Sequence, residues 1–175
     1  ATSASGAAMT FRPEIEKHLH LQMPFVTEAF FGRKVFIVEG ETEFGAIRSW
    51  AEKLSIESDD IGLTFVSADG YGGALPLLLI LHKFGIPAIA LLDKDAQAQV
   101  QKQTQQPDYT GLMNCVDYTT ETDFEHDLVT FLMPRSASVL RKILEAYDEL
   151  GAKRTLEQKV IQDTATKYGI TSQSA

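Results

Sequence analysis

The sequence contains little cysteine and no long apolar run. Its 175 residues include one cysteine, Cys115, so no internal disulfide can form, which is typical of a reducing compartment. The longest strongly apolar stretch, residues 73–81, is too short to span a bilayer. The start of the chain lacks the basic region and apolar run of a signal peptide. We therefore expect a cytoplasmic protein with no membrane segment.

Basic residues are also scarce. Lysine and arginine together number 16 against 24 acidic residues, which gives a formal net charge of -8. This balance argues against tight, sequence-independent DNA binding by the chain alone, because such binding requires Lys and Arg to neutralise phosphates. Nucleic-acid chemistry is not excluded, since bound metal ions cancel local negative charge and basic surface can come from another domain or subunit.

The length suffices for one domain with a real core, and the pattern divides the chain into four parts. Residues 1–10 are read as a disordered lead-in or tag, 11–32 as an N-terminal helical segment, 33–122 as an α/β core and 123–175 as a helical extension. The N-terminal helix is expected over residues 13–31, with an interruption near Pro24.

Within the core, short β-branched and apolar runs alternate with helical periodicity, which predicts βαβ units. Such units build a parallel sheet of about four strands with helices on both faces. The predicted strands are 34–38, 62–67, 86–92 and 111–116, and the predicted helices are 42–54, 74–84, 95–105, 124–132, 136–150 and 155–168. Gly70, Gly72 and Gly73 are expected to form a flexible turn. Trp50 is expected in the core, and Cys115 is expected to be buried in the fourth strand.

Acidic residues follow the strands. In an open α/β sheet, ligands bind beyond the carboxyl ends of the strands. Glu39 ends the first strand and Glu43 comes four residues later, while Asp93 and Asp95 follow the third. If Gly40 makes a tight turn, both glutamates can face one cleft. The two aspartates share a side if the chain is still extended there.

Four such carboxylates would repel one another by roughly 4 kcal/mol per pair at ~4 Å. The cluster is therefore either splayed into water or neutralised by protons or a metal. Hard oxygen ligands favour Mg²⁺, Mn²⁺ or Ca²⁺ over zinc. The structural alternative is that an acid at a helix start serves only as a cap or a dipole partner.

Two segments carry a family resemblance. KVFIVEGETE (residues 34–43) followed by IPAIALLDKD (residues 86–95) resembles the Toprim domain of topoisomerases, primases and some nucleases. Its signature is a glutamate after the first strand and Asp-x-Asp after the third. The longer segment EAFFGRKVFIVEGETE (residues 28–43) is similar to the Toprim domain of overcoming-lysogenization-defect (OLD) proteins. The resemblance covers about residues 25–132.

OLD-family proteins are nucleases that typically join an ATPase to this domain and cut DNA with two divalent metals. The resemblance implies that Glu39, Asp93 and Asp95 surround one ion and that Glu43 lies at or near a second. The expected ions are Mg²⁺ or Mn²⁺, with Ca²⁺ able to bind. The family also places an acid at the start of a Glu-x-x-Leu helix, which Glu125 fits.

Five further residues are weaker candidates. Asp123 is the alternative to Glu125, and Lys167 is the candidate for a functional lysine of the family. Lys94, with Gly72 and Gly73, could contact phosphate.

The chain has no Gly-x-x-x-x-Gly-Lys-Ser/Thr loop, so an ATPase is expected in another domain or subunit, and the chain is either a fragment or a stand-alone Toprim protein. The expected partners are DNA and a second copy of the chain. Two alternatives stay open. One is a flavodoxin-like aspartate phosphoacceptor or phosphatase that uses Asp93. The other is a non-catalytic Toprim assembly module.

Overall fold

The computed structural model describes residues 12–13, 15–17, 20, 26–132, 135, 138–139, 142 and 166. The chain divides into two compact units, Ala1–Tyr118 and Thr119–Ala175, which are described separately. The predicted helix at 136–150 lies outside the described residues except at 138–139 and 142, and the one at 155–168 except at 166. Much of the predicted helix at 13–31 also lies outside them. In the part of the chain that is described, no helix has the length and apolar character to cross a bilayer.

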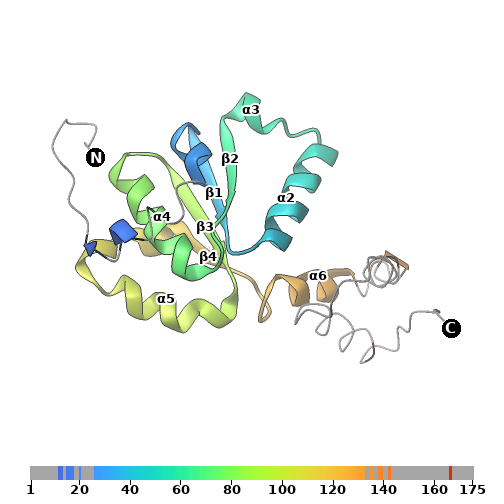
Figure 1. Ribbon diagram of the computed structural model, residues 1–175. Coiled ribbons are helices and arrows are strands. Elements are labelled where there is room, and N and C mark those ends of the chain that lie inside the picture. Colours follow the sequence, from blue (N-terminus) through green and yellow to red (C-terminus); the bar gives the residue numbers. More distant parts are fainter. Residues whose placement is uncertain are drawn as a thin grey trace. The chain divides into compact units, whose positions relative to one another are not determined.

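A four-stranded parallel sheet forms the centre of the first unit (Figure 1). Its strands are β1 (Lys34–Val38), β2 (Leu63–Ser67), β3 (Ala88–Leu92) and β4 (Val116–Tyr118). They lie in the order β2-β1-β3-β4, and all pairs are parallel. The predicted α/β architecture is confirmed.

Helices connect the strands of the sheet. Those of the first unit are α2 (Glu41–Lys53), α3 (Ser58–Ile61), α4 (Tyr71–Lys83) and α5 (Gln97–Thr104), with short 3-10 helices η1 (Thr27–Phe30), η2 (Lys94–Ala96), η3 (Pro107–Tyr109) and η4 (Leu112–Cys115). The second unit contains α6 (Phe124–Leu132), at the predicted bounds.

The sheet face that packs on α4, here called the α4 face, carries the core. Side chains alternate along a strand, and Val35 and Ile37 of β1 point to this face, where both are buried. Every residue of α4 from Gly73 to Leu81 is buried. The helix is apolar all round, which is the pattern expected of a buried helix.

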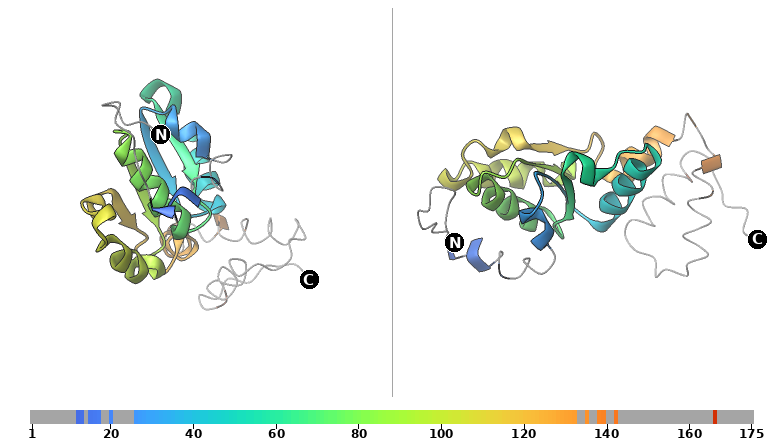
Figure 2. Two further views of the ribbon diagram at one scale, coloured as in Figure 1. Left: turned by 60° about the vertical axis from the view of Figure 1, so that its left-hand side comes forward. Right: turned by 90° about the horizontal axis from the view of Figure 1, so that it is seen from above.

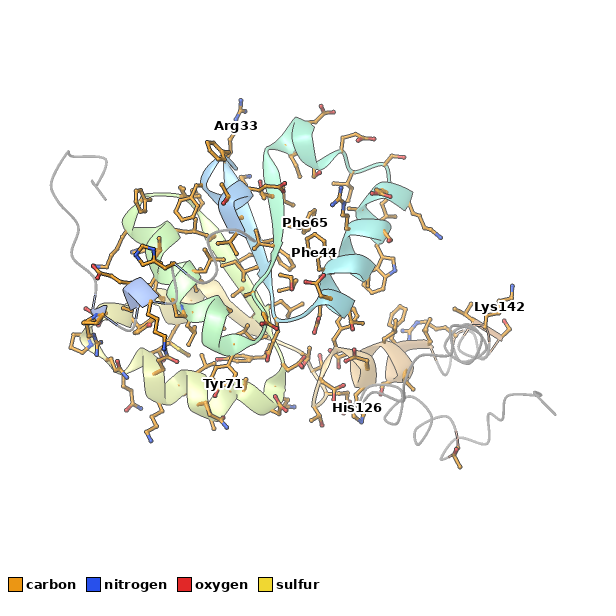
Figure 3. All side chains as sticks on the ribbon, viewed as in Figure 1. Arg33, Phe44, Phe65, Tyr71, His126 and Lys142 are labelled. Atoms are coloured by element: carbon orange, nitrogen blue, oxygen red, sulfur yellow. The ribbon has the colours of Figure 1, made fainter. Side chains whose placement is uncertain are left out.

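The opposite face, here called the α2 face, is packed more loosely. Helices α2 and α4 lie on opposite sides of the sheet (Figures 1 and 2), and Phe44 of α2 lies near Phe65 of β2 (Figure 3). Phe36 pairs in register with both Phe65 and Ile89. The Phe36 and Phe65 rings meet edge to face with their centroids 5.9 Å apart, a spacing typical of aromatic pairs. Ile89 is nevertheless 51% exposed.

Four local predictions are wrong. Trp50 is 44% exposed rather than in the core. Residues 111–116 do not form the fourth strand, because the chain turns at Gly111, where φ is 88°, and continues as η4. The strand β4 begins only at Val116, and Cys115 is half-buried in η4. The turn before α4 is also shorter than predicted, since the helix begins at Tyr71.

Candidate metal centre

The carboxyl edge of the sheet brings together the residues that follow β1, β2 and β3. The helices α2 and α4 both begin at this edge, at the lower side of the sheet in Figure 1. In Figure 3, Tyr71 at the start of α4 marks this edge, and Arg33 just before β1 marks the opposite one. The sequence candidates Glu39, Glu43 and Asp93 therefore lie at the edge where α/β sheets bind ligands.

Glu39 and Asp93 are in direct contact. The backbone N–H of Asp93 donates a hydrogen bond to Oε2 of Glu39 at 2.9 Å, and both residues are half-buried. They follow neighbouring parallel strands, β1 and β3, whose register brings Val38 beside Leu91. Sheet pairing thus joins two acids that are 54 positions apart in the sequence.

The exit of β2 is tied to the same residue. The N–H of Gly70 donates to the carbonyl oxygen of Glu39 at 2.8 Å. The turn that allows this contact has left-handed backbone angles, with φ 53° at Asp69 and 96° at Gly70. Glycine adopts such angles without the steric cost that a Cβ brings. Three strand exits therefore converge on Glu39.

Glu43 has a structural partner. It is only 5% exposed, and its Oε2 accepts a hydrogen bond from the N–H of Gly40 at 3.1 Å. Gly40 is the N-cap residue of α2, so Glu43 reaches back to satisfy a backbone donor at the helix start. Its carboxylate also lies at the positive end of the helix dipole. A metal-ligand role for Glu43 stays a prediction.

Asp95 and Lys94 lie in η2 and are exposed. Asp93 itself has extended backbone, with φ -67° and ψ 142°, but the chain then turns, and the N–H of Ala96 donates to the Asp93 carbonyl at 3.1 Å. The extended Asp-x-Asp considered from the sequence does not occur, so strand alternation does not place Asp95 on the side of Asp93. Among the described residues, no three Asp, Glu, His or Cys side chains form a preassembled metal-ligand set.

The phosphate candidates Gly72 and Gly73 lie in the first turn of α4. The N–H of Gly73 donates to the carbonyl of Gly70 at 3.0 Å. Gly72 is half-buried, and a Cβ placed there would meet no described atom within 4 Å. Both assignments stay predictions, and Gly72 has the more open surroundings.

In the second unit, Asp123 is a helix cap. Its Oδ1 accepts hydrogen bonds from the backbone N–H of His126 at 2.9 Å and contacts the His126 Nδ1 at 2.7 Å. This geometry supports the structural interpretation of Asp123. Glu125 is in the first turn of α6 and 6% exposed, and its role as a metal ligand stays a prediction. Lys167 lies outside the described residues.

No sequence pattern points to Tyr118. This residue ends β4 beside Leu92, the residue before Asp93, so only strand pairing reveals that it lies next to the candidate centre. Burial raises the pKa of its phenol above the ordinary value. Its hydroxyl is buried and has no hydrogen-bond partner within the described part of the chain. At neutral pH Tyr118 is therefore a neutral group at the carboxyl edge.

The donor chemistry fits a hard divalent cation. The side chains at this edge supply carboxylate oxygens, and Glu39 already lies against Asp93. Carboxylates of this kind are the ligands that Mg²⁺ and Mn²⁺ prefer. Glu39, Asp93 and Asp95 are the residues that could hold such an ion.

Comparison with known proteins finds a family model that matches the sequence around the carboxyl edge and solved structures with the same fold. Residues 30–95 match the family model of the overcoming lysogenization defect protein-like TOPRIM domain. The match contains β1, β2 and β3 and the four candidate acids Glu39, Glu43, Asp93 and Asp95. The Toprim resemblance seen in the sequence is thus confirmed for this segment. No curated protein sequence matches the chain.

Solved structures of OLD proteins share the fold. The C-terminal region of the Xanthomonas campestris pv. campestris OLD protein is 19% identical, with 81% of this chain and 82% of that chain covered and a TM-score of 0.51. The C-terminal region of the Burkholderia pseudomallei OLD protein is 17% identical, with coverage of 81% and 77% and a TM-score of 0.56. At these identities the likeness shows a common fold.

Proposed function

We propose that the chain is the catalytic Toprim module of a divalent-metal-dependent DNA nuclease that hydrolyses phosphodiesters. The observation that carries the proposal is the contact between Glu39 and Asp93 at the carboxyl edge, within the segment that matches the OLD-like Toprim model. Mg²⁺ or Mn²⁺ is the proposed cofactor, most simply as two ions, and Ca²⁺ would bind without being the natural ion.

In this proposal Glu39, Asp93 and Asp95 hold the first ion, and Glu125 contributes to the second. Bound divalent ions would supply a water of lowered pKa and charge stabilisation at the leaving oxygen. The protein's part is to hold Glu39 in place through the Asp93 N–H and to orient the phosphate. Lys94, which is exposed between the two aspartates, and the first turn of α4 at Gly72 are the proposed phosphate contacts.

The test is nicking of supercoiled plasmid in Mg²⁺ or Mn²⁺. Asp93→Ala should lower the rate about 100-fold or more, since it removes an ion ligand, and even the loss of a residue that only hydrogen-bonds to an ion ligand costs about 10–100-fold. Asp60→Ala is the matched control, because Asp60 is an exposed acid in α3, and it should cut at the wild-type rate. Activity that survives in Asp93→Ala would overturn the site.

The proposed partners are DNA, an ATPase domain or subunit that supplies basic surface, and a second copy of the chain, all in the cytoplasm. The net charge of -8 is the reason to expect help in DNA binding. The isolated chain should therefore cut weakly, and its rate should rise when the ATPase partner is added. If the cutting rate at physiological salt did not change when the partner was added, the proposal that the partner supplies the DNA-binding surface would be wrong.

Two direct measurements would separate the proposed nuclease from the two alternative functions. An aspartate phosphoacceptor would gain about 80 Da at Asp93 after incubation with acetyl phosphate, whereas the nuclease should keep its mass. A non-catalytic assembly module would bind neither Mg²⁺ nor Mn²⁺ in calorimetry.

A further inference from the structure

A cavity of about 300 Å³ opens at the amino edge of the sheet, the edge opposite the candidate metal centre. It is bounded by the first residues of the inner strands β1 and β3, by α4 and by η4. Arg33, which marks this edge in Figure 3, directly precedes the lining residue Lys34. All of its lining residues belong to the first unit, and no part of the proposed nuclease chemistry uses them.

The late start of β4 accounts for this cavity. The first pair between β3 and β4 joins Ala90 to Val116, so Ala88 and Ile89 at the start of β3 have no neighbour on β4. The chain in front of β4 forms η4 instead of a strand, and Cys115 at its end lines the cavity. Apolar side chains at the start of the sheet are therefore open to a ligand.

The lining is apolar inside and basic at the mouth. Leu78 and Leu112 are buried and form part of the wall. Lys34 and His82 also line the cavity but are exposed, which places them at its mouth. None of the described lining residues is acidic, although the chain carries a net charge of -8. Lys34 takes part in none of the ion pairs among the described residues.

We propose that this cavity binds a small apolar anion, a carboxylate with an unbranched chain of about eight carbons. Ligand sites commonly measure about 300–1,000 Å³. At about 30 Å³ per non-hydrogen atom, the volume of a molecule in liquid water, the cavity holds roughly ten such atoms, which is the size of octanoate. The chain would lie against Leu78 and Leu112, and the carboxylate would lie at Lys34, where opposite charges attract.

The single cysteine of the chain, Cys115, allows occupancy to be measured, because it lines the cavity. Its rate of reaction with a maleimide is followed in the full chain as octanoate is added. Octanoate should slow the reaction at least about fivefold, with half of the effect below about 10 mM, the affinity expected of a ligand of this size. An unchanged rate throughout this range would overturn the proposal.

Two further ligands test the charge and the chain separately. Octylammonium has the same chain and the opposite charge, so it should bind about fivefold or more weakly than octanoate. Butanoate keeps the carboxylate and should bind at least about tenfold more weakly, because each buried methylene contributes about a factor of four. Equal binding of octanoate and octylammonium would rule out selection of an anion, and equal binding of butanoate would rule out an apolar site.

A charge variant tests the mouth of the cavity. Lys34→Gln should weaken octanoate binding about two- to fivefold, the modest effect expected at an exposed charge, and should leave octylammonium binding no weaker. Lys102→Gln is the matched control, because Lys102 is an exposed lysine in α5 that does not line the cavity. The same loss of octanoate binding in both variants would mean that the net charge, and not Lys34, attracts the anion.

A filling variant tests the interior. Ala88 is half-buried and lines the cavity, so in Ala88→Leu the larger side chain should weaken octanoate binding about tenfold or more, and octanoate should no longer slow Cys115 labelling. Ala98→Leu is the matched control, because Ala98 is exposed in α5. Protection by octanoate that persists in Ala88→Leu would place the ligand elsewhere.

NMR of the wild type decides the location if Ala88→Leu does not fold. Octanoate should shift the amide signals of Ile89 and Cys115 at the amino edge and leave those of Gly40 and Asp93 at the carboxyl edge unchanged. Shifts confined to the carboxyl edge, or spread equally over both edges, would contradict the proposed site. This result does not depend on whether the chain cuts DNA, so the two proposals fail or stand separately.

Discussion

The two faces of the sheet differ in how completely they are covered. On the α4 face, the strands and the helix are buried together, with Leu75 and Leu78 at 0% and 1% exposure. On the α2 face, Phe36 and Phe65 are half-buried and Ile89 is 51% exposed. The free energy gained on folding grows with the apolar area removed from water. The α4 face should therefore contribute most of the free energy of unfolding. Helix α2 packs on the less covered face, and its first turn contains the hydrogen bond between Gly40 and Glu43.

Truncating one side chain on each face gives the largest expected contrast. Leu78→Ala should lower the free energy of unfolding by about 2–5 kcal/mol, because it leaves a cavity in a packed core. Ile89→Ala should cost about 1 kcal/mol or less, since half of that side chain is in water already. Urea denaturation measures both. Equal losses would show that the α2 face is covered as fully as the α4 face.

A smaller effect of the opposite sign is expected within α2. Gly45 is exposed in the interior of this helix, and glycine there is less favourable than alanine by about 0.5–1 kcal/mol. Gly45→Ala should therefore raise the unfolding free energy by that amount, measured by the same denaturation. A lower unfolding free energy in Gly45→Ala would contradict the exposed position of Gly45 in α2.

The smallest effect at neutral pH involves Tyr109, which is 3% exposed and part of the core cluster. Burial raises the pKa of its phenol above 10.0, against a smaller opposing effect of the hydrogen bond from Gln103. The unfolded chain therefore loses this proton first. The stabilisation is fully present below pH 10.0 and is lost as pH rises through the folded pKa. Tyr109→Phe should flatten the alkaline decline in urea titrations, and an identical decline would contradict this assignment.

Most of the fold could be predicted from the sequence because β1, β3 and α4 are continuous apolar runs with clear ends. The fourth strand was misplaced because residues 111–116 are as apolar as a strand, and the left-handed turn at Gly111 makes them helical. Trp50 was misassigned because helical spacing does not tell which side of α2 faces the sheet.

The sequence predicts which acids lie at the candidate site, but only part of their arrangement in space. Strand exits identified Glu39 and Asp93, and the sheet brings them into contact. The turn after Asp93 and the bond from Glu43 to Gly40 could not be predicted, because both depend on backbone geometry beyond the strand ends. Tyr118 was missed because its place beside Asp93 depends on the pairing of β4 with β3.

In the proposed centre, Glu39 and Asp93 share a divalent cation. The most direct measurement is a crystal soaked in Mn²⁺, with anomalous scattering used to locate the ions. We expect a manganese peak between the carboxylates of Glu39 and Asp93, absent in Asp93→Ala. Manganese bound elsewhere, with none at these two carboxylates, would contradict it.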